Sequence, residues 1–133
     1  MKRPTPPIEW AEDHIRIIDQ TLLPAEVRVI EIRSADQAVD AIQRLAIRGA
    51  PALGAFGSFA LIIAVDEIKP ESLSQALARL EECRNLIGDA RPTAVNLRWA
   101  VDRVIDEATK NVDDLVSLRS SLIREAQAVA AED

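Results

Sequence analysis

The 133-residue sequence predicts an α+β fold, with a three-stranded antiparallel sheet in residues 1–33 and about five helices in residues 34–133. Three observations support this prediction. Short β-prone runs are confined to the beginning of the chain. Apolar residues recur at helical spacing from residue 34 onward. One segment, residues 51–65, is apolar almost throughout, which is typical of a helix buried on all sides. We treat the whole chain as one domain with a sheet subregion and a helical subregion.

The sheet is expected to form from three short runs, at residues 8–10, 14–18 and 26–32. These runs are rich in isoleucine and valine, which favour strands. The few polar residues between the first two runs allow a tight connection. In the third run the side chains alternate between two faces, so Ile30 and Ile32 share one of them.

Two helices are expected next. Ser34 followed by Gln37 is a capping-box pattern that begins the first helix. Pro51 suits the first turn of the second helix, where its missing N–H needs no partner. This second helix should end before Lys69, which precedes another proline.

Three further helices follow from the same kinds of signal. Ser72 repeats the capping pattern, and Gly88 follows the expected end of that helix. Pro92 is expected to open the fourth helix, and Asn111 or Asp113 to cap the fifth. The side chains expected to face the core are Ala38, Val39, Ile42, Leu45, Leu73, Ala76, Leu77, Leu80, Cys83, Ile87, Leu97, Val101, Val104, Ile105, Ala108, Leu115, Leu118, Leu122, Ala126 and Val129.

Composition excludes several classes of function. The net charge of −6 argues against nucleic-acid binding, which needs a basic face. No segment reads as a signal peptide or a membrane span. The single cysteine cannot form an internal disulfide, which favours a reducing compartment and a cytoplasmic location.

The isolated polar and titratable residues show no sequence pattern typical of catalysis or metal binding. Cys83 lies on an apolar helical stripe and is expected to be a buried, inert thiol. His14, the single histidine, is expected to occupy a position in the sheet. One histidine and one cysteine far apart in the sequence exclude an ordinary metal cluster of these ligands. Asp19 and Gln20 lie in the loop 19–24, where they form a turn or face a ligand pocket.

The strongest candidate for a site is a pair of arginines, each followed by a proline that suits a helix start. Arg48 precedes Pro51, and Arg91 precedes Pro92. A helix N-terminus offers free N–H groups, and arginine adds a fork of donors, so the two arginines could hold one phosphate. In the alternative interpretation, each arginine makes only local caps or ion pairs. Gly54 and Gly57 share a face of the helix that follows Arg48, which allows another backbone or a ligand to approach closely.

Three motifs together resemble the beginning of methylthioribose-1-phosphate isomerases, which are relatives of the alpha, beta and delta subunits of translation initiation factor 2B. The motifs, which a Glu9-Trp10 pair accompanies, are Ile17-Ile18-Asp19-Gln20-Thr21-Leu22-Leu23-Pro24, Ile47-Arg48-Gly49-Ala50-Pro51-Ala52-Leu53-Gly54 and Arg91-Pro92-Thr93-Ala94-Val95-Asn96-Leu97. Their order and spacing agree along the chain, and the third motif favours the isomerase branch.

The resemblance implies an aldose–ketose isomerisation of methylthioribose 1-phosphate in methionine salvage, with no metal or organic cofactor. It implies a cytoplasmic dimer in which a domain like this one precedes a Rossmann-like catalytic domain. Substrate contacts carry over to Arg48, Gly49, Ala50 and Arg91. The family's catalytic cysteine and aspartate belong to the later domain, and Cys83 does not match that cysteine's motif. We therefore expect no catalytic residue in this chain and no activity of the chain alone.

Two other functions remain open at this point. A near relative isomerises ribose 1,5-bisphosphate, whose second phosphate needs additional positive charge. A non-enzymatic subunit like those of initiation factor 2B would bind a sugar phosphate or nucleotide and assemble with other chains.

Overall fold

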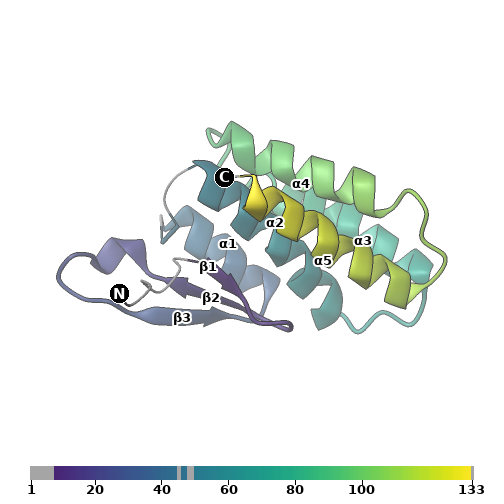
Figure 1. The fold of residues 1–133 in the computed structure, drawn as a ribbon, viewed down its shortest axis with the longest axis horizontal. Coiled ribbons are helices and arrows are strands. Elements are labelled where there is room, and N and C mark those ends of the chain that lie inside the picture. Colours follow the sequence, from purple (N-terminus) through teal and green to yellow (C-terminus); the bar gives the residue numbers. More distant parts are fainter. Residues whose placement is uncertain (1–7, 45, 48–49, 133) are drawn as a thin grey trace.

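The computed structural model describes residues 8–44, 46–47 and 50–132 and confirms the α+β fold (Figure 1). A three-stranded sheet lies along one side of a group of five α-helices. The helix α2, Ala50–Glu67, is central: it packs against each of the other α-helices and against two strands. One continuous apolar core joins the sheet to the helices.

The sheet has the order β1-β2-β3, and both strand pairs are antiparallel. The strands are β1 (Ile8–Trp10), β2 (Ile15–Ile18) and β3 (Val29–Ile32). The third strand begins later than predicted. The short 3-10 helix η1, Gln20–Leu22, is followed by a turn at residues 23–25, and residues 26–28 form no regular structure. The expected alternation holds, since Ile15, Ile17 and Ile32 are buried on the face toward the helices.

The first helix, α1 (Ala35–Gln43), begins at the predicted cap. The hydroxyl of Ser34 accepts a hydrogen bond from the Gln37 N–H at 3.1 Å. The return bond of a capping box is shifted by one residue, because the Gln37 side chain accepts from the Arg33 N–H instead. Ser72 and Gln75 repeat this arrangement at the start of α3, Leu73–Leu86.

Helix α2 is buried as the sequence predicts. Every residue from 53 to 65 is buried, which includes both of its phenylalanines. The hydroxyl of Ser58, the buried polar residue of this helix, donates to the Gly54 carbonyl at 2.7 Å. Phe59 stacks on Trp10 with ring centroids 5.2 Å apart, which ties the sheet to the centre of the helical group.

The last two helices correct the sequence-based boundaries. Helix α4 spans Val95–Ala108, so it begins three residues after Pro92, which lies in a turn closed by the Ala94 N–H donating to the Arg91 carbonyl. Helix α5 spans Leu115–Ala131, and its cap is Asp114, neither Asn111 nor Asp113. Asp114 is favoured because Ser117 completes a reciprocal capping box with it.

The predicted core faces are largely confirmed. Most of the expected inward side chains are buried, and Val39, Leu73, Leu77, Leu115 and Val129 are partly buried against the core. Leu45 lies outside the described residues. Within the described ranges, no helix combines the length and apolar character that crossing a membrane requires.

Candidate functional site

The candidate site lies at the end of the helical group where α2 and α4 begin and α5 ends (Figure 1). Two pockets open at this end, and both are lined by Asn96 in the first turn of α4. The approach of α2 and α4 is close because Gly54 faces α4: a Cβ at Gly54 would lie 3.2 Å from the Ala100 Cβ and 3.6 Å from the Asn96 carbonyl oxygen. The predicted close approach at Gly54 is therefore confirmed, with a helix as the neighbour.

The first pocket, of about 390 Å³, surrounds the turn that leads into α4. Its lining residues are Leu53, Arg91, Thr93, Ala94, Val95, Asn96 and Leu97. The cap position of α4 is Ala94, which has no side chain able to bond the first N–H groups of the helix. The positive end of the α4 dipole therefore faces this pocket without a side-chain cap.

Arg91 differs from the other arginines that the structure describes. Each of the others forms at least one ion pair with a carboxylate, whereas Arg91 forms none within the described part of the chain. Arg91 lines the pocket beside the start of α4, which has no side-chain cap. An uncompensated guanidinium next to a helix N-terminus is suited to bind an anion such as a phosphate.

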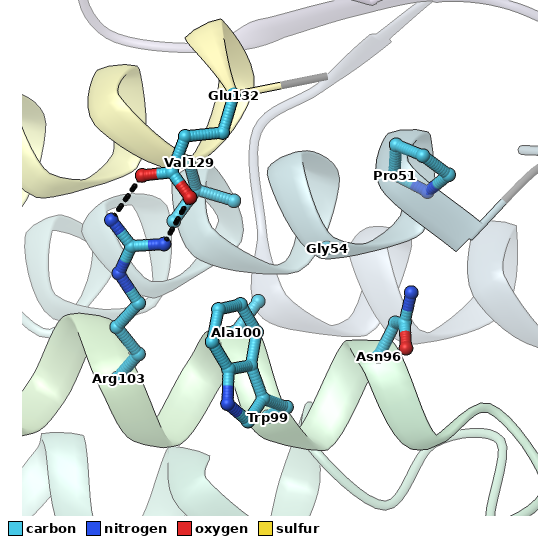
Figure 2. Close-up of a pocket in the computed structure, with 8 residues that line it drawn as sticks. All are labelled: Pro51, Gly54, Asn96, Trp99, Ala100, Arg103, Val129 and Glu132. Carbon is cyan, nitrogen blue, oxygen red and sulfur yellow. Dashed lines mark hydrogen bonds and ion pairs between the residues drawn. The ribbon is translucent and has the colours of Figure 1, made fainter.

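The second pocket, of about 250 Å³, lies between the beginning of α2, the first turns of α4 and the end of α5 (Figure 2). Its lining residues are Pro51, Gly54, Asn96, Trp99, Ala100, Arg103, Val129 and Glu132. Arg103 reaches from α4 to Glu132, and the two form a bidentate ion pair with one contact at 2.7 Å. The guanidinium also lies over the Trp99 ring, 5.4 Å from its centroid.

The Arg103–Glu132 pair compensates its own charges. Hydrogen bonding to Arg103 lowers the pKa of the Glu132 carboxyl, and the same bond raises the pKa of Arg103. Both groups therefore stay ionised at neutral pH and cancel each other. The two pockets therefore differ. One contains Arg91, which has no carboxylate partner among the described residues, and the other contains an internally neutral ion pair beside apolar side chains.

The structure describes two of the four predicted substrate-binding residues. Arg91 lies in the first pocket, and Ala50 is the first residue of α2. Arg48 and Gly49 lie outside the described residues, so the meeting of two arginines on one phosphate stays a prediction. Sequence reasoning did not select Asn96, although it belongs to a quoted motif.

Three other pocket residues were also missed. Trp99, Arg103 and Glu132 belong to no motif that sequence reasoning selected, although all three line the second pocket. Only the packing of α4 against the end of α5 brings them together.

Asp19 forms a turn and does not line either pocket. It is buried, and its carboxylate accepts from the Thr21 N–H at 2.9 Å, from the Thr21 hydroxyl at 2.6 Å and from Arg44 at 3.1 Å. These hydrogen bonds, led by the one from the Thr21 side chain, lower the pKa of Asp19. The neighbouring Gln20 N–H donates to the Ala46 carbonyl. Asp19 and Gln20 thus hold the segment that leads into α2.

The remaining titratable candidates have structural roles. Cys83 is fully buried, and burial raises the pKa of its thiol to about 11. The prediction that His14 occupies a position in the sheet is wrong, because β2 begins at Ile15 and His14 lies in the bend before it. Its ring lies between two carboxylates, with Nδ1 2.6 Å from Asp13 and Nε2 3.4 Å from Glu31. Across the described residues, no group of three or more histidine, cysteine or acidic side chains could hold a metal ion.

Comparison with known proteins identifies relatives of this chain. Residues 46–133 match the Initiation factor 2 subunit family. The chain is 35% identical over 127 residues to the methylthioribose-1-phosphate isomerase of Trichormus variabilis, covering 96% of this chain and 37% of that protein. It is 37% identical to the 5-deoxyribose 1-phosphate isomerase of Moorella thermoacetica, covering 100% of this chain and 38% of the relative.

A solved structure has the same fold. The translation initiation factor eIF-2B subunit delta from A. fulgidus matches with a TM-score of 0.89 and 35% identity, over 96% of this chain and 37% of that one. The chain therefore spans between a third and two fifths of the length of each of these relatives.

Proposed function

We propose, since the chain belongs to the Initiation factor 2 subunit family, that it is the substrate-binding part of an aldose–ketose isomerase. Its substrate is methylthioribose 1-phosphate and its product methylthioribulose 1-phosphate, as the name of the Trichormus relative suggests. The reaction belongs to methionine salvage. In this proposal a Rossmann-like domain supplies the chemistry, and residues 1–133 form one domain that anchors the phosphate.

The charge of Arg91, uncompensated by any described residue, is the observation that carries this proposal. Among the arginines in the described part of the chain it alone has no carboxylate partner, and it lines a pocket at the uncapped start of α4. A phosphate bound there would be fixed at one end of the sugar, which leaves the other carbons free for proton transfer by a separate group. We assign Arg48, Gly49 and Ala50 to the same phosphate from the family motif.

Arginine itself does not move the proton. Its guanidinium stays protonated at neutral pH and is a poor general base. The chain would therefore supply binding and orientation, while the acid or base comes from elsewhere in the assembled enzyme. We further propose that this enzyme is a cytoplasmic dimer, which measurement of its mass in solution would check.

A second function is a regulatory subunit that binds a sugar phosphate or nucleotide without turning it over. The likeness to the A. fulgidus initiation factor subunit favours it, since that structure is as similar in sequence as the Trichormus isomerase. Both functions use the same anion pocket, so binding alone does not separate them. Conversion of the bound sugar does.

The test of the anion pocket is to replace Arg91→Ala in this chain and measure methylthioribose 1-phosphate binding by calorimetry. We expect the binding free energy to become less favourable by about 1.5–3 kcal/mol, which is typical of the loss of a hydrogen bond to a charged group. Arg124→Ala is the matched control, because that arginine is exposed on α5 and has a local partner on the same helix. We expect Arg48→Ala to weaken binding by a similar amount.

The proposal fails at this point if Arg91→Ala and Arg124→Ala bind with the affinity of the parent chain. A change in melting temperature common to both variants would be a stability effect and is read separately by thermal unfolding. Loss confined to Arg91→Ala, with unchanged melting, assigns the phosphate to the first pocket.

A further inference from the structure

We propose that the second pocket, between α2, α4 and α5, receives the unphosphorylated apolar end of the sugar phosphate and discriminates against a sugar with a second phosphate. This inference rests on the proposed function, because it assumes that the phosphate binds at Arg91. It assigns a specificity role to Trp99, Val129 and the Arg103–Glu132 pair.

The two pockets are neighbours around one residue. Asn96 lines both of them, and its side-chain amide points toward the start of α2 at Pro51 (Figure 2). A pentose with its phosphate in the first pocket would pass Asn96 before its other end reaches the second. The amide offers both a donor and an acceptor, which suits the hydroxyl groups of the sugar between the two ends.

The shape and lining of the second pocket suit a small apolar group. Its volume of about 250 Å³ is below the usual range for a whole ligand and fits one end of a small one. Pro51, Trp99 and Val129 supply an apolar wall, and Trp99 keeps 57% of its surface exposed, so a ligand can still cover it. A methylthio or methyl group placed there would bury apolar surface against the indole ring.

The charges of this pocket argue against a second phosphate. Among the described residues that line it, Arg103 is the single cation, and both oxygens of Glu132 already bond it. A phosphate at this point would lie next to the Glu132 carboxylate and would have to displace it from Arg103. The pocket therefore favours a 5-alkylthio or 5-deoxy pentose 1-phosphate and disfavours ribose 1,5-bisphosphate, because specificity here depends on a repulsive element as well as an attractive one.

The first experiment uses Trp99 as the reporter. In a Trp10→Phe background the chain keeps one tryptophan, and its fluorescence is followed during titration with methylthioribose 1-phosphate, 5-deoxyribose 1-phosphate, ribose 1,5-bisphosphate and inorganic phosphate. We expect the two apolar sugar phosphates to change the emission of Trp99. Inorganic phosphate should compete with both of them while leaving that emission unchanged, since it occupies only the first pocket.

Two substitutions then separate the contribution of the apolar wall to ligand binding from that of the Arg103–Glu132 ion pair. Trp99→Ala should weaken methylthioribose 1-phosphate about tenfold and leave inorganic phosphate unaffected, as for the loss of one small apolar contact. Glu132→Gln should free Arg103 and improve ribose 1,5-bisphosphate binding about tenfold. Binding to these variants is measured by calorimetry.

The matched controls lie away from the pocket. Val116→Ser removes an exposed valine at the opposite end of α5. Glu107→Gln removes a carboxylate in the last turn of α4, which pairs with Lys110 just beyond the helix. Neither should change the ranking of the ligands.

The outcomes distinguish this inference from the proposed function. If no sugar phosphate and no inorganic phosphate binds the parent chain, the anion site itself is wrong, and the inference falls with it. If they bind but Trp99→Ala weakens all of them equally, or Glu132→Gln leaves the preference unchanged, only the specificity assignment is overturned.

Discussion

Asp19 shows how a residue in a family motif can serve the fold and still matter for the site. Its carboxylate bonds Thr21 and Arg44, and the adjacent Gln20 bonds Ala46. The contact from Gln20 holds Ala46, which shortly precedes in the sequence the residues predicted to contact the phosphate, Arg48 to Ala50. We therefore assign Asp19 a positioning role.

The first residue-scale prediction concerns the pH dependence of this bond network. The folded state lowers the pKa of Asp19 below its ordinary value near 3.8, so its contribution to stability is fully present above that value. It is lost as the pH falls through the folded-state pKa. Urea unfolding should therefore show a gap in stability between the parent and Asp19→Asn at pH 7 that closes progressively below about pH 4.

Asp40→Asn is the control for this measurement, because Asp40 is exposed and bonds the same Arg44. It should cost little at any pH, since exposed ion pairs contribute about 0–1 kcal/mol. A gap for Asp19→Asn that stays constant between pH 7 and pH 2 would contradict the assignment.

At the scale of elements, α2 depends on glycines that face α4. A Cβ at Gly57 would lie 2.4 Å from a methyl group of Leu97 and 3.4 Å from Val101. A leucine at Gly54 would meet Ala100 across the same interface. The two helices can stay in contact only while these positions remain small.

We accordingly predict that Gly54→Leu and Gly57→Leu each destabilise the protein by about 1–3 kcal/mol or more, as overpacking of a filled core does. Thermal unfolding measures the effect. Ser120→Leu, on an exposed position of α5, should change the melting temperature little. Melting of both glycine variants within a degree or two of the parent would show that α2 is not the centre of the fold.

Gly88 shows that a correct signal can have a different physical cause. It follows the end of α3 as predicted, yet its backbone is not in the left-handed conformation that the usual helix-ending glycine adopts. A Cβ there would lie 2.2 Å from the Arg84 carbonyl oxygen and 2.8 Å from the Arg98 side chain. The position needs glycine for space, beside a network in which both arginines bond Asp102.

At the scale of the whole molecule, the described candidates for proton transfer that the sequence singles out, Asp19, His14 and Cys83, lie outside both pockets. Cys83 is buried with a raised pKa, and Asp19 is held by Thr21 and Arg44. His14 belongs to the connection between β1 and β2, and the Glu12 carbonyl of this connection accepts a hydrogen bond from Arg119 on α5. Arg119 is more than two helical turns away from Val129, the α5 residue that lines the second pocket, so the connection is far from that pocket.

The whole-molecule prediction is that residues 1–133 bind methylthioribose 1-phosphate without converting it. Incubation of the purified chain with this sugar should yield the ketose no faster than buffer alone. Binding in the same sample is checked through Trp99 emission, which separates an inactive complex from a failure to bind. Turnover above the buffer rate that disappears in Asp19→Asn or Cys83→Ser would overturn the prediction and place a catalytic group in this chain.

The sequence by itself determined the three strands, the five helices and the buried character of α2, because periodicity, capping residues and apolar runs act over a few neighbouring positions. It also pointed to Arg91 and, through Pro92, misplaced the start of α4, since a turn bonded by Ala94 competes with the helix there.

Only the tertiary structure decided which groups share a pocket. Arg91 lacks an ion pair because no carboxylate in the described part of the chain packs beside it, and sequence patterns do not report such an absence. Asn96, Trp99 and Glu132 meet because the start of α4 packs beside the end of α5, two segments separated by most of both helices. Long-range packing sets that meeting, and so it decides what the site can recognise.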